Sequence, residues 1–297
     1  MRSSDRQTGA VSIQFGDRPR DDELDLFGLT HRGLVRKNNQ DQFLLATVHP
    51  QVLIHGTSLP SAESLPLRGE RLATLMLVAD GVGGGAAGNE ASRVAIEAIT
   101  RYVSSTLRSY HAAGTAAEGE LLATLREAAL EAHTAVLADA TGKPERAGMA
   151  TTLTLALAVW PWAYVVQVGD SRCYCFQDGT LRQVTRDQTV AQDLVDRGVL
   201  PPERVSDSPF GSMLASAIGG EEAVPEVTRV DIRARGTLLL LCSDGLMKHV
   251  SDAEIAERVA GMESSEWLCR SLLALALERG GTDNITLIAG RARVATP

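Results

Sequence analysis

The chain has 297 residues, of which 44% are hydrophobic and 22% charged, and its formal net charge is −8. This composition suffices for one large core or two modest ones, and it excludes disorder throughout, a collagen-like fold and a disulfide-stapled scaffold. The acidic excess argues against nucleic-acid binding, because domains that bind a phosphate backbone usually carry a basic face.

The N-terminal third of the sequence predicts an arm, three strands and a long loop. Residues 1–22 are polar and charged, so we expect a flexible arm ahead of a single domain at 23–293. Short apolar runs predict strands at 24–29, 42–48 and 74–79. The segment 49–72, rich in Pro, Ser and Gly, is predicted to be an inserted surface loop.

The rest of the chain alternates between helical and strand periodicity. Apolar residues at helical spacing predict amphipathic helices at 89–109 and 118–140. A meander follows, with strands at 151–159, 162–168, 171–177 and 181–184. The remaining predictions are a short helix within 187–210, strands at 237–242 and 284–290, and helices near 252–260 and 266–279. Because strands come in batches separated by helix pairs, we predict an α+β layered sandwich.

Signals for secretion, membrane insertion and zinc binding are lacking in the sequence. No apolar run reaches the roughly 20 residues of a membrane-spanning helix, and the N-terminus lacks the apolar stretch of a signal peptide. The four cysteines form no C-x-x-C pair, and no two histidines are spaced i, i+4 on a predicted helix. We therefore expect a cytoplasmic protein with reduced cysteines and no direct membrane insertion.

Four aspartates stand where predicted strands end or begin: Asp80, Asp170, Asp244 and Asp283. Each lies beside or near a glycine, so each taken singly is equally well explained as a turn residue. If they converge, their repulsion requires divalent cations, and oxygen ligands without His or Cys select Mg²⁺ or Mn²⁺. Two such ions about 4 Å apart would activate a water for attack on phosphorus. Arg36 is a candidate to bind the phosphate, although an isolated arginine is usually a solvated surface residue.

The glycine-rich stretch after the third strand allows another interpretation. Gly83, Gly85 and Gly88 formally fit G-x-G-x-x-G between a strand and a helix, which is typical of dinucleotide binding. That motif needs a second strand ending in an acid about 20 residues later, and the sequence instead continues through two helices. A Walker loop is excluded because Asn89 stands where lysine should follow Gly88.

Short motifs follow one another in order over roughly residues 25–290. They are G-L-V-R-K-N-N-Q-D (33–41), V-A-D-G-V-G-G (78–84), G-M-A-T-T-L (148–153), V-G-D-S-R-C-Y (168–174), T-R-D (185–187), L-C-S-D-G-L (241–246) and G-T-D-N-I-T (281–286). This ordered series resembles the protein phosphatase 2C family of metal-dependent serine/threonine phosphatases. Short motifs that match in series rarely agree by chance. The resemblance implies an α-β-β-α sandwich of two antiparallel sheets flanked by helix pairs.

The resemblance also implies a role for each candidate residue. Asp80 would bridge two metal ions, with the Gly81 carbonyl on the second. Asp244 and Asp283 would complete the first metal site, and Asp170 with Asp244 would hold a weaker third ion. Arg36 would bind the substrate phosphate, and Asp41 would support the second metal either through water or by contacting the residues that hold it. The segment 187–215 would form a mobile flap.

The function so implied is Mn²⁺- or Mg²⁺-dependent hydrolysis of phosphoserine and phosphothreonine in proteins. We expect a monomer whose partners are a phosphorylated substrate protein and a cognate bacterial Ser/Thr kinase. Several positions depart from the family pattern, namely Gln40, Val82, Gly85, Asn89 and Gln188. Of these departures, Gln40, Gly85 and Asn89 leave open an alternative, a catalytically weak pseudophosphatase that binds phosphoproteins.

Overall fold

Several strands are apolar along their whole length, so they must be covered on both faces. In β3 (Ala73–Val82), Leu75 and Leu77 pack among helix residues, whereas Met76 and Val78 pack among residues of the opposite sheet. Strand β10 (Leu238–Cys242) shows the same alternation: Leu238 and Leu240 belong to one apolar cluster, and Leu239 and Leu241 belong to another. Because successive side chains of a strand point to opposite faces, this pattern produces four layers.

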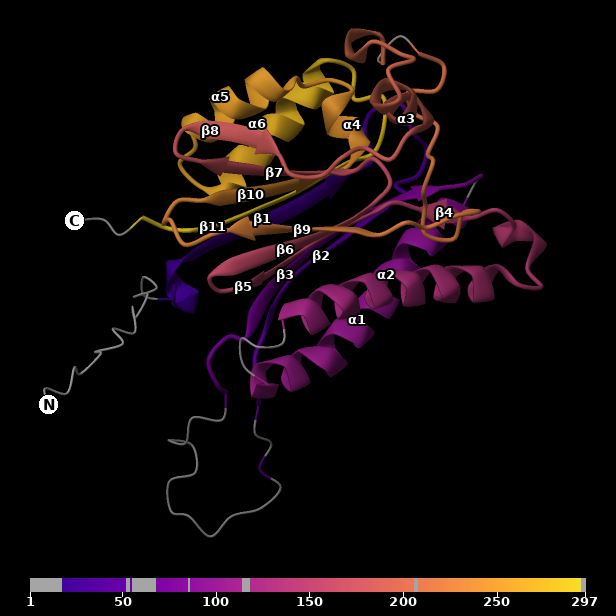
Figure 1. The fold of residues 1–297 in the computed structure, drawn as a ribbon. Coiled ribbons are helices and arrows are strands. Elements are labelled where there is room, and N and C mark those ends of the chain that lie inside the picture. The colour runs from indigo at the N-terminus through magenta and orange to yellow at the C-terminus, as the bar shows by residue number, and fades with distance from the viewer. Residues whose placement is uncertain are drawn as a thin grey trace, which may run out of the picture.

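The computed structural model describes residues 18–51, 54, 68–84, 86–113, 118–205 and 208–294, and within them two antiparallel sheets lie face to face (Figure 1). The first has the order β1 (Leu24–His31), β11 (Ile285–Ala292), β10, β7 (Arg172–Gln177), β8 (Thr180–Gln183). The second has the order β2 (Asp41–Val48), β3, β5 (Leu153–Val159), β6 (Trp162–Val168), β9 (Glu226–Asp231). The short β4 (Ala150–Thr151) pairs with the end of β3.

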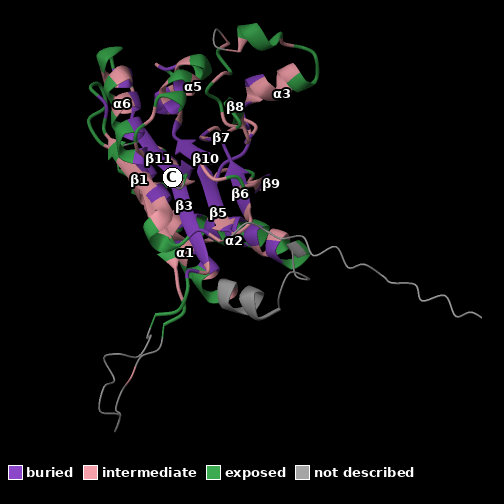
Figure 2. Ribbon diagram, turned by 90° about the vertical axis from the view of Figure 1, so that its left-hand side faces the viewer, coloured by how far each residue is buried: buried purple, intermediate pink, exposed green. Residues whose placement is uncertain are grey.

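Helices cover the outer face of each sheet. The long helices α1 (Ala87–Ala113) and α2 (Glu118–Ala140) pack on the second sheet, and α4 (Asp244–Met247), α5 (Asp252–Ala260) and α6 (Ser265–Glu278) lie over the first. Helix α3 (Val190–Asp196) belongs to the segment between β8 and β9. Figure 2 shows the strands buried in the middle and the exposed residues on the outer sides of the helices.

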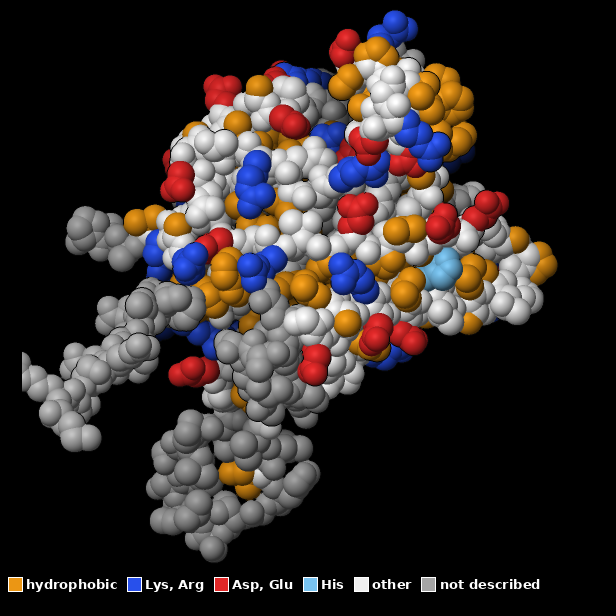
Figure 3. All heavy atoms as spheres, viewed as in Figure 1, with side chains coloured by type: hydrophobic (Ala, Val, Ile, Leu, Met, Phe, Trp, Pro, Cys, Tyr) orange, Lys and Arg blue, Asp and Glu red, His pale blue; other side chains and the backbone are white. Residues whose placement is uncertain are grey.

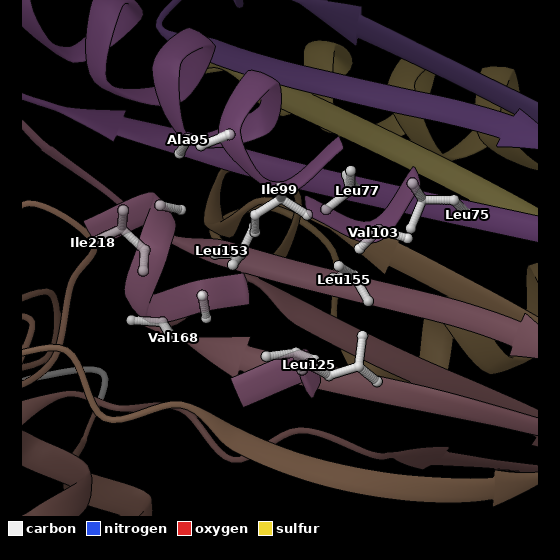
Figure 4. Close-up of a cluster of buried hydrophobic side chains, with 14 of the residues drawn as sticks. Leu75, Leu77, Ala95, Ile99, Val103, Leu125, Leu153, Leu155, Val168 and Ile218 are labelled. Atoms are coloured by element: carbon white, nitrogen blue, oxygen red, sulfur yellow. The ribbon is translucent and has the colours of Figure 1, made fainter. Parts of the chain in front are cut away.

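The apolar core has three parts, one per interface between layers. The largest lies between the second sheet and the helix pair α1 and α2, where Ile99 and Leu125 meet Leu155 (Figure 4). A second lies between the first sheet and α4 to α6, and a third lies between the two sheets. All four cysteines are buried and free, in agreement with the sequence.

The predicted α+β sandwich is confirmed, and each predicted strand and helix occurs within a few residues of its expected bounds. Strand β9 was not predicted, because its sequence EVTRVD has one buried residue, Val230, and an edge strand needs no apolar run. The predicted strand 151–159 is interrupted at Thr152, which separates β4 from β5. Most of the loop 49–72 and of the arm 1–22 lies outside the described residues.

The described surface is mixed in character. Figure 3 shows a face on which basic and acidic side chains alternate with apolar ones. Among the described residues, no helix combines the length and the apolar character that a bilayer-spanning segment needs.

The layered packing predicts unequal effects for the same substitution at two leucines. Leu155 is 1% exposed inside the largest cluster, and Leu130 on α2 is 44% exposed. We expect Leu155→Ala to lower the free energy of unfolding by about 2–5 kcal/mol, and Leu130→Ala to lower it by about 0.5 kcal/mol or less. Urea denaturation followed by circular dichroism measures both, and equal losses would contradict the assigned core.

Candidate metal centre

Strand pairing gathers the predicted carboxylates at one end of the sandwich. The register of β2 with β3 places Asp41 directly opposite Asp80, and such pairs have Cβ atoms about 5 Å apart. Asp170 follows the end of β6, Asp244 follows β10, and Asp283 precedes β11. Residues distant in sequence therefore meet because antiparallel strands begin and end at the same edge.

A recess of about 840 Å³, open to solvent, lies at this end of the molecule. Its walls include every predicted site residue except Asp41. The lining residues are Arg36, Gln40, Asp80, Gly81, Val82, Gly83, Thr152, Asp170, Ser212, Leu214, Asp244, Lys248, Asp283 and Asn284. The structure thus brings four carboxylates and two cationic side chains to one opening.

Asp41 is buried and does not line the recess. It is 1% exposed, and its Oδ2 accepts hydrogen bonds of 2.7 Å from Ser243 Oγ and from Thr286 Oγ1. Its Oδ1 is buried without a hydrogen-bond partner. Ser243 and Thr286 were not predicted from the sequence, although each lies within three residues of a predicted aspartate.

The backbone at Asp80 and Gly81 is held firmly. Asp80 N donates to Thr152 Oγ1 at 3.0 Å, and Thr151 Oγ1 donates to the Asp80 carbonyl at 2.9 Å. A Cβ at position 81 would lie 2.1 Å from the Gly88 carbonyl oxygen, so only glycine fits here. This close approach of the β3 end to the start of α1 fixes the position of the Gly81 carbonyl.

Two of the departures from the family pattern have structural roles beside the recess. Gln40 Nε2 donates to the Gly83 carbonyl at 3.0 Å. Gln188 Oε1 accepts from Gly169 N at 2.9 Å, next to Asp170. Both amides therefore brace loops that carry candidate ligands.

The clustered carboxylates resist ionisation. Burial, together with the charges of Asp41 and Asp244, raises the pKa of Asp80 well above its usual range. Burial and the charge of Asp244 raise the pKa of Asp170 to about 7. Burial likewise raises the pKa of Asp41 to about 6, although hydrogen bonds from Thr286 and Ser243 oppose the rise. Nearby cations are needed to keep the group fully charged at neutral pH.

Among the described residues, Arg36 and Lys248 supply positive charge by ion pairs on the side of the recess formed by Asp244 and Asp283. Asp283 Oδ2 lies 2.7 Å from both Arg36 Nη2 and Lys248 Nζ. Burial opposes ionisation of Asp283, yet the hydrogen bonds from Arg36 and Lys248 lower its pKa. Lys248 Nζ also lies 2.6 Å from Asp244 Oδ2.

The donor set suits a hard divalent ion. It consists of carboxylate and carbonyl oxygens, and the buried Oδ1 atoms of Asp41 and Asp244 have no hydrogen-bond partner. As the side chains lie, no three Asp, Glu, His or Cys groups of the described chain are already arranged to hold a metal ion. Two of the carboxylates are instead held by Lys248 and Arg36.

The four-layered fold and the acidic recess at one end can now be compared with known protein families. The family model "Protein phosphatase 2C" matches residues 67–275, more than half of the chain. The chain belongs to the protein phosphatase 2C family, as the sequence motifs predicted.

Particular relatives agree with this assignment. The chain is similar to the serine/threonine protein phosphatase PstP of Mycobacterium tuberculosis, with 36% identity over 86% of this chain and 43% of that protein. The chain thus corresponds to less than half the length of that relative. It is also 30% identical to the serine/threonine phosphatase stp of Listeria welshimeri, over 87% of this chain and 92% of that one.

Solved structures show the same fold. A crystal structure of Mycobacterium tuberculosis PstP superposes with a TM-score of 0.71 at 32% identity, covering 91% of this chain and 99% of that chain. The catalytic domain of PstP in complex with two manganese ions gives a TM-score of 0.70 at 31% identity, with the same coverage.

The raised pKa values predict how pH affects the metal-free protein. Because the pKa of Asp170 rises to about 7 on folding, the folded chain holds a proton that the unfolded chain has lost. Protonation of Asp170 therefore favours the folded state. This stabilisation is complete below the unfolded pKa of about 4, and it is lost as the pH rises through the folded pKa. In EDTA we therefore expect the Tm of wild type to fall, relative to that of Asp170→Asn, between about pH 5 and about pH 7.5.

Calorimetry at several pH values, with EDTA and with Mn²⁺, measures this effect. The rise in Tm on adding Mn²⁺ should be larger above pH 7 than near pH 5, because protons compete with the metal for the same carboxylates. Parallel pH profiles of wild type and Asp170→Asn in EDTA would show that Asp170 ionises normally.

Proposed function

We propose that this chain is a metal-dependent protein phosphatase that hydrolyses phosphoserine and phosphothreonine. The observation that carries the proposal is the convergence of Asp80, Asp170, Asp244 and Asp283 around an open recess that also presents Arg36. The similarity to proteins named serine/threonine phosphatases supports the same activity.

Asp80, the Gly81 carbonyl, Asp244 and Asp283 are the proposed ligands of two Mn²⁺ or Mg²⁺ ions. Asp170 with Asp244 would hold a third ion, and Asp41 would act through water, in keeping with its position away from the recess. When bound, these ions would make water a better nucleophile and offset the charge of the phosphoryl oxygens. The PstP structure with two manganese ions supports this assignment.

Arg36 is the proposed phosphate-binding residue. Its side chain is 53% exposed, so its guanidinium can reach a phosphate that enters from solvent. A planar guanidinium donates two parallel hydrogen bonds to phosphate oxygens, which orients the phosphoryl group as well as attracting it. Arg36 must then exchange part of its contact with Asp283 for a contact with the substrate.

The flap proposed at 187–215 would shape access to the recess. Ser212 and Leu214 line the recess. The two ends of the segment are joined by hydrogen bonds from Val190 N to the Met213 carbonyl (2.8 Å) and from Ala215 N to the Gln188 carbonyl (2.9 Å). The segment therefore leaves and re-enters the fold at one point, as a hinged element would.

The proposed partners follow from the chemistry. The substrate is a phosphorylated protein, and the opposing enzyme is a bacterial Ser/Thr kinase. We expect the chain to act as a monomer.

Single substitutions test the carboxylate assignment. Asp80→Asn and Asp244→Asn should each lower the rate of phosphothreonine-peptide hydrolysis with Mn²⁺ by at least about 100-fold, because each removes a charge that holds metal. Asp178→Asn is the matched control: Asp178 lies in an exposed turn with φ of 51°, a conformation that asparagine tolerates.

Phosphate release by wild type in Mn²⁺, in Mg²⁺ and in EDTA completes this test. Activity that survives EDTA, or that all three variants retain, would rule out the proposed centre. Phosphopeptide binding by wild type without turnover in either metal would instead support the pseudophosphatase.

A further inference from the structure

Lys248 was not predicted to take part in the site, yet it reaches the centre of it. It follows the short helix α4 and stands one turn after Asp244, so the two side chains lie on one face. Its Nζ donates to Asp244 Oδ2 at 2.6 Å and to Asp283 Oδ2 at 2.7 Å. One ammonium group thus joins two carboxylates from different strand ends.

The charge of Lys248 is stabilised by this position. Burial opposes an ammonium charge, but the attraction of Asp244 and Asp283 outweighs it and raises the pKa of Lys248 above its usual value. In turn, the ammonium offsets two negative charges that would otherwise repel each other in a partly buried place. Lys248 therefore acts as an internal counter-ion of the metal-free centre.

The same two carboxylates are the proposed ligands of the first metal ion. Asp244 Oδ1 has no hydrogen-bond partner, whereas Lys248 Nζ lies 2.6 Å and 2.7 Å from the Oδ2 atoms of Asp244 and Asp283. Because carboxylate oxygens bind Mg²⁺ at about 2.1 Å, an ion held by both aspartates would lie close to the Lys248 ammonium whichever oxygens it used. Two cations at such separations repel strongly in a partly buried site. The ammonium and the ion cannot both keep these contacts.

We propose that Lys248 and the first metal ion compete for Asp244 and Asp283, so that metal binding on this side requires displacement of the lysine. This inference rests on the proposed function, because it requires the two aspartates to be metal ligands. Lys248 then sets the affinity of the first metal site and stabilises the protein before metal arrives.

The competition is confined to one side of the centre. Within the part of the chain that the structure describes, neither Asp80 nor Asp170 makes an ion pair with lysine or arginine. An ion bound through Asp80 and the Gly81 carbonyl displaces no cation. The two metal sites should therefore differ in affinity, and only one should respond to Lys248.

Isothermal titration of the metal-free protein with Mn²⁺ tests the proposal. Lys248→Met removes the charge and keeps an unbranched side chain, so we expect one Mn²⁺ dissociation constant to fall by about tenfold or more. In EDTA the same variant should have a lower Tm than wild type, because Asp244 and Asp283 lose their counter-ion. Lys248→Arg, which keeps the charge, should stay close to wild type in both measurements.

Lys37→Met is the matched control for a general change in charge. Lys37 is exposed in the loop that carries Arg36, and it forms no ion pair among the described residues. Its substitution should change neither the Mn²⁺ affinity nor the Tm in EDTA. If Lys248→Met does not fold without metal, Lys248→Gln gives the same comparison with a hydrogen-bond donor retained.

The outcomes separate this inference from the proposed function. If wild type binds no Mn²⁺, the proposed metal centre fails and the competition fails with it. If wild type binds Mn²⁺ and the uncharged variants bind it equally or more weakly, the centre stands and the competition is refuted. Tighter Mn²⁺ binding together with a lower Tm in EDTA would establish Lys248 as the displaced counter-ion.

Discussion

The repulsion between carboxylates gathered at one end of a buried sandwich is the constraint on which the rest of the site depends. Asp80 lies beside Asp41 and near Asp244, and burial denies Asp80 and Asp41 the water that would screen their charges. The free-energy cost of this arrangement must be offset by protons, by Lys248 and Arg36, or by divalent cations. The rigidity of the two sheets prevents the chain from relieving it by moving the carboxylates apart.

The sandwich supplies that rigidity because each strand near the site is covered on both faces. Leu239 and Leu241 of β10 pack between the sheets, and Leu240 packs in the cluster between the first sheet and helices α4 to α6, so Asp244 follows a strand that is packed on both faces. The close contact of Gly81 with Gly88 likewise restricts the position of the end of β3. Interior packing thus positions these candidate ligands more than the loops on which they stand.

Much of the fold and of the candidate site could be predicted from the sequence. The continuous apolar run before Asp80 and the leucine run before Asp244 show that both residues follow buried strands, and the glycines nearby mark the strand ends. Strand β9 was not predicted because it is an edge strand with one buried residue, and its exposed positions are polar or charged. The bracing of Asp41 by Ser243 and Thr286 depends on which strands become neighbours, which local periodicity does not contain.

The position of β11 has a consequence for synthesis of the protein. It is the last strand in sequence order among the described residues, yet it lies in the interior of its sheet between β1 and β10. Asp283 stands just before it, and Thr286 within it bonds Asp41. A chain that stops short of residue 283 still carries the other candidate ligands, but it lacks Asp283, Thr286 and the strand that joins β1 to β10. Its first sheet would be split and its acidic centre incomplete.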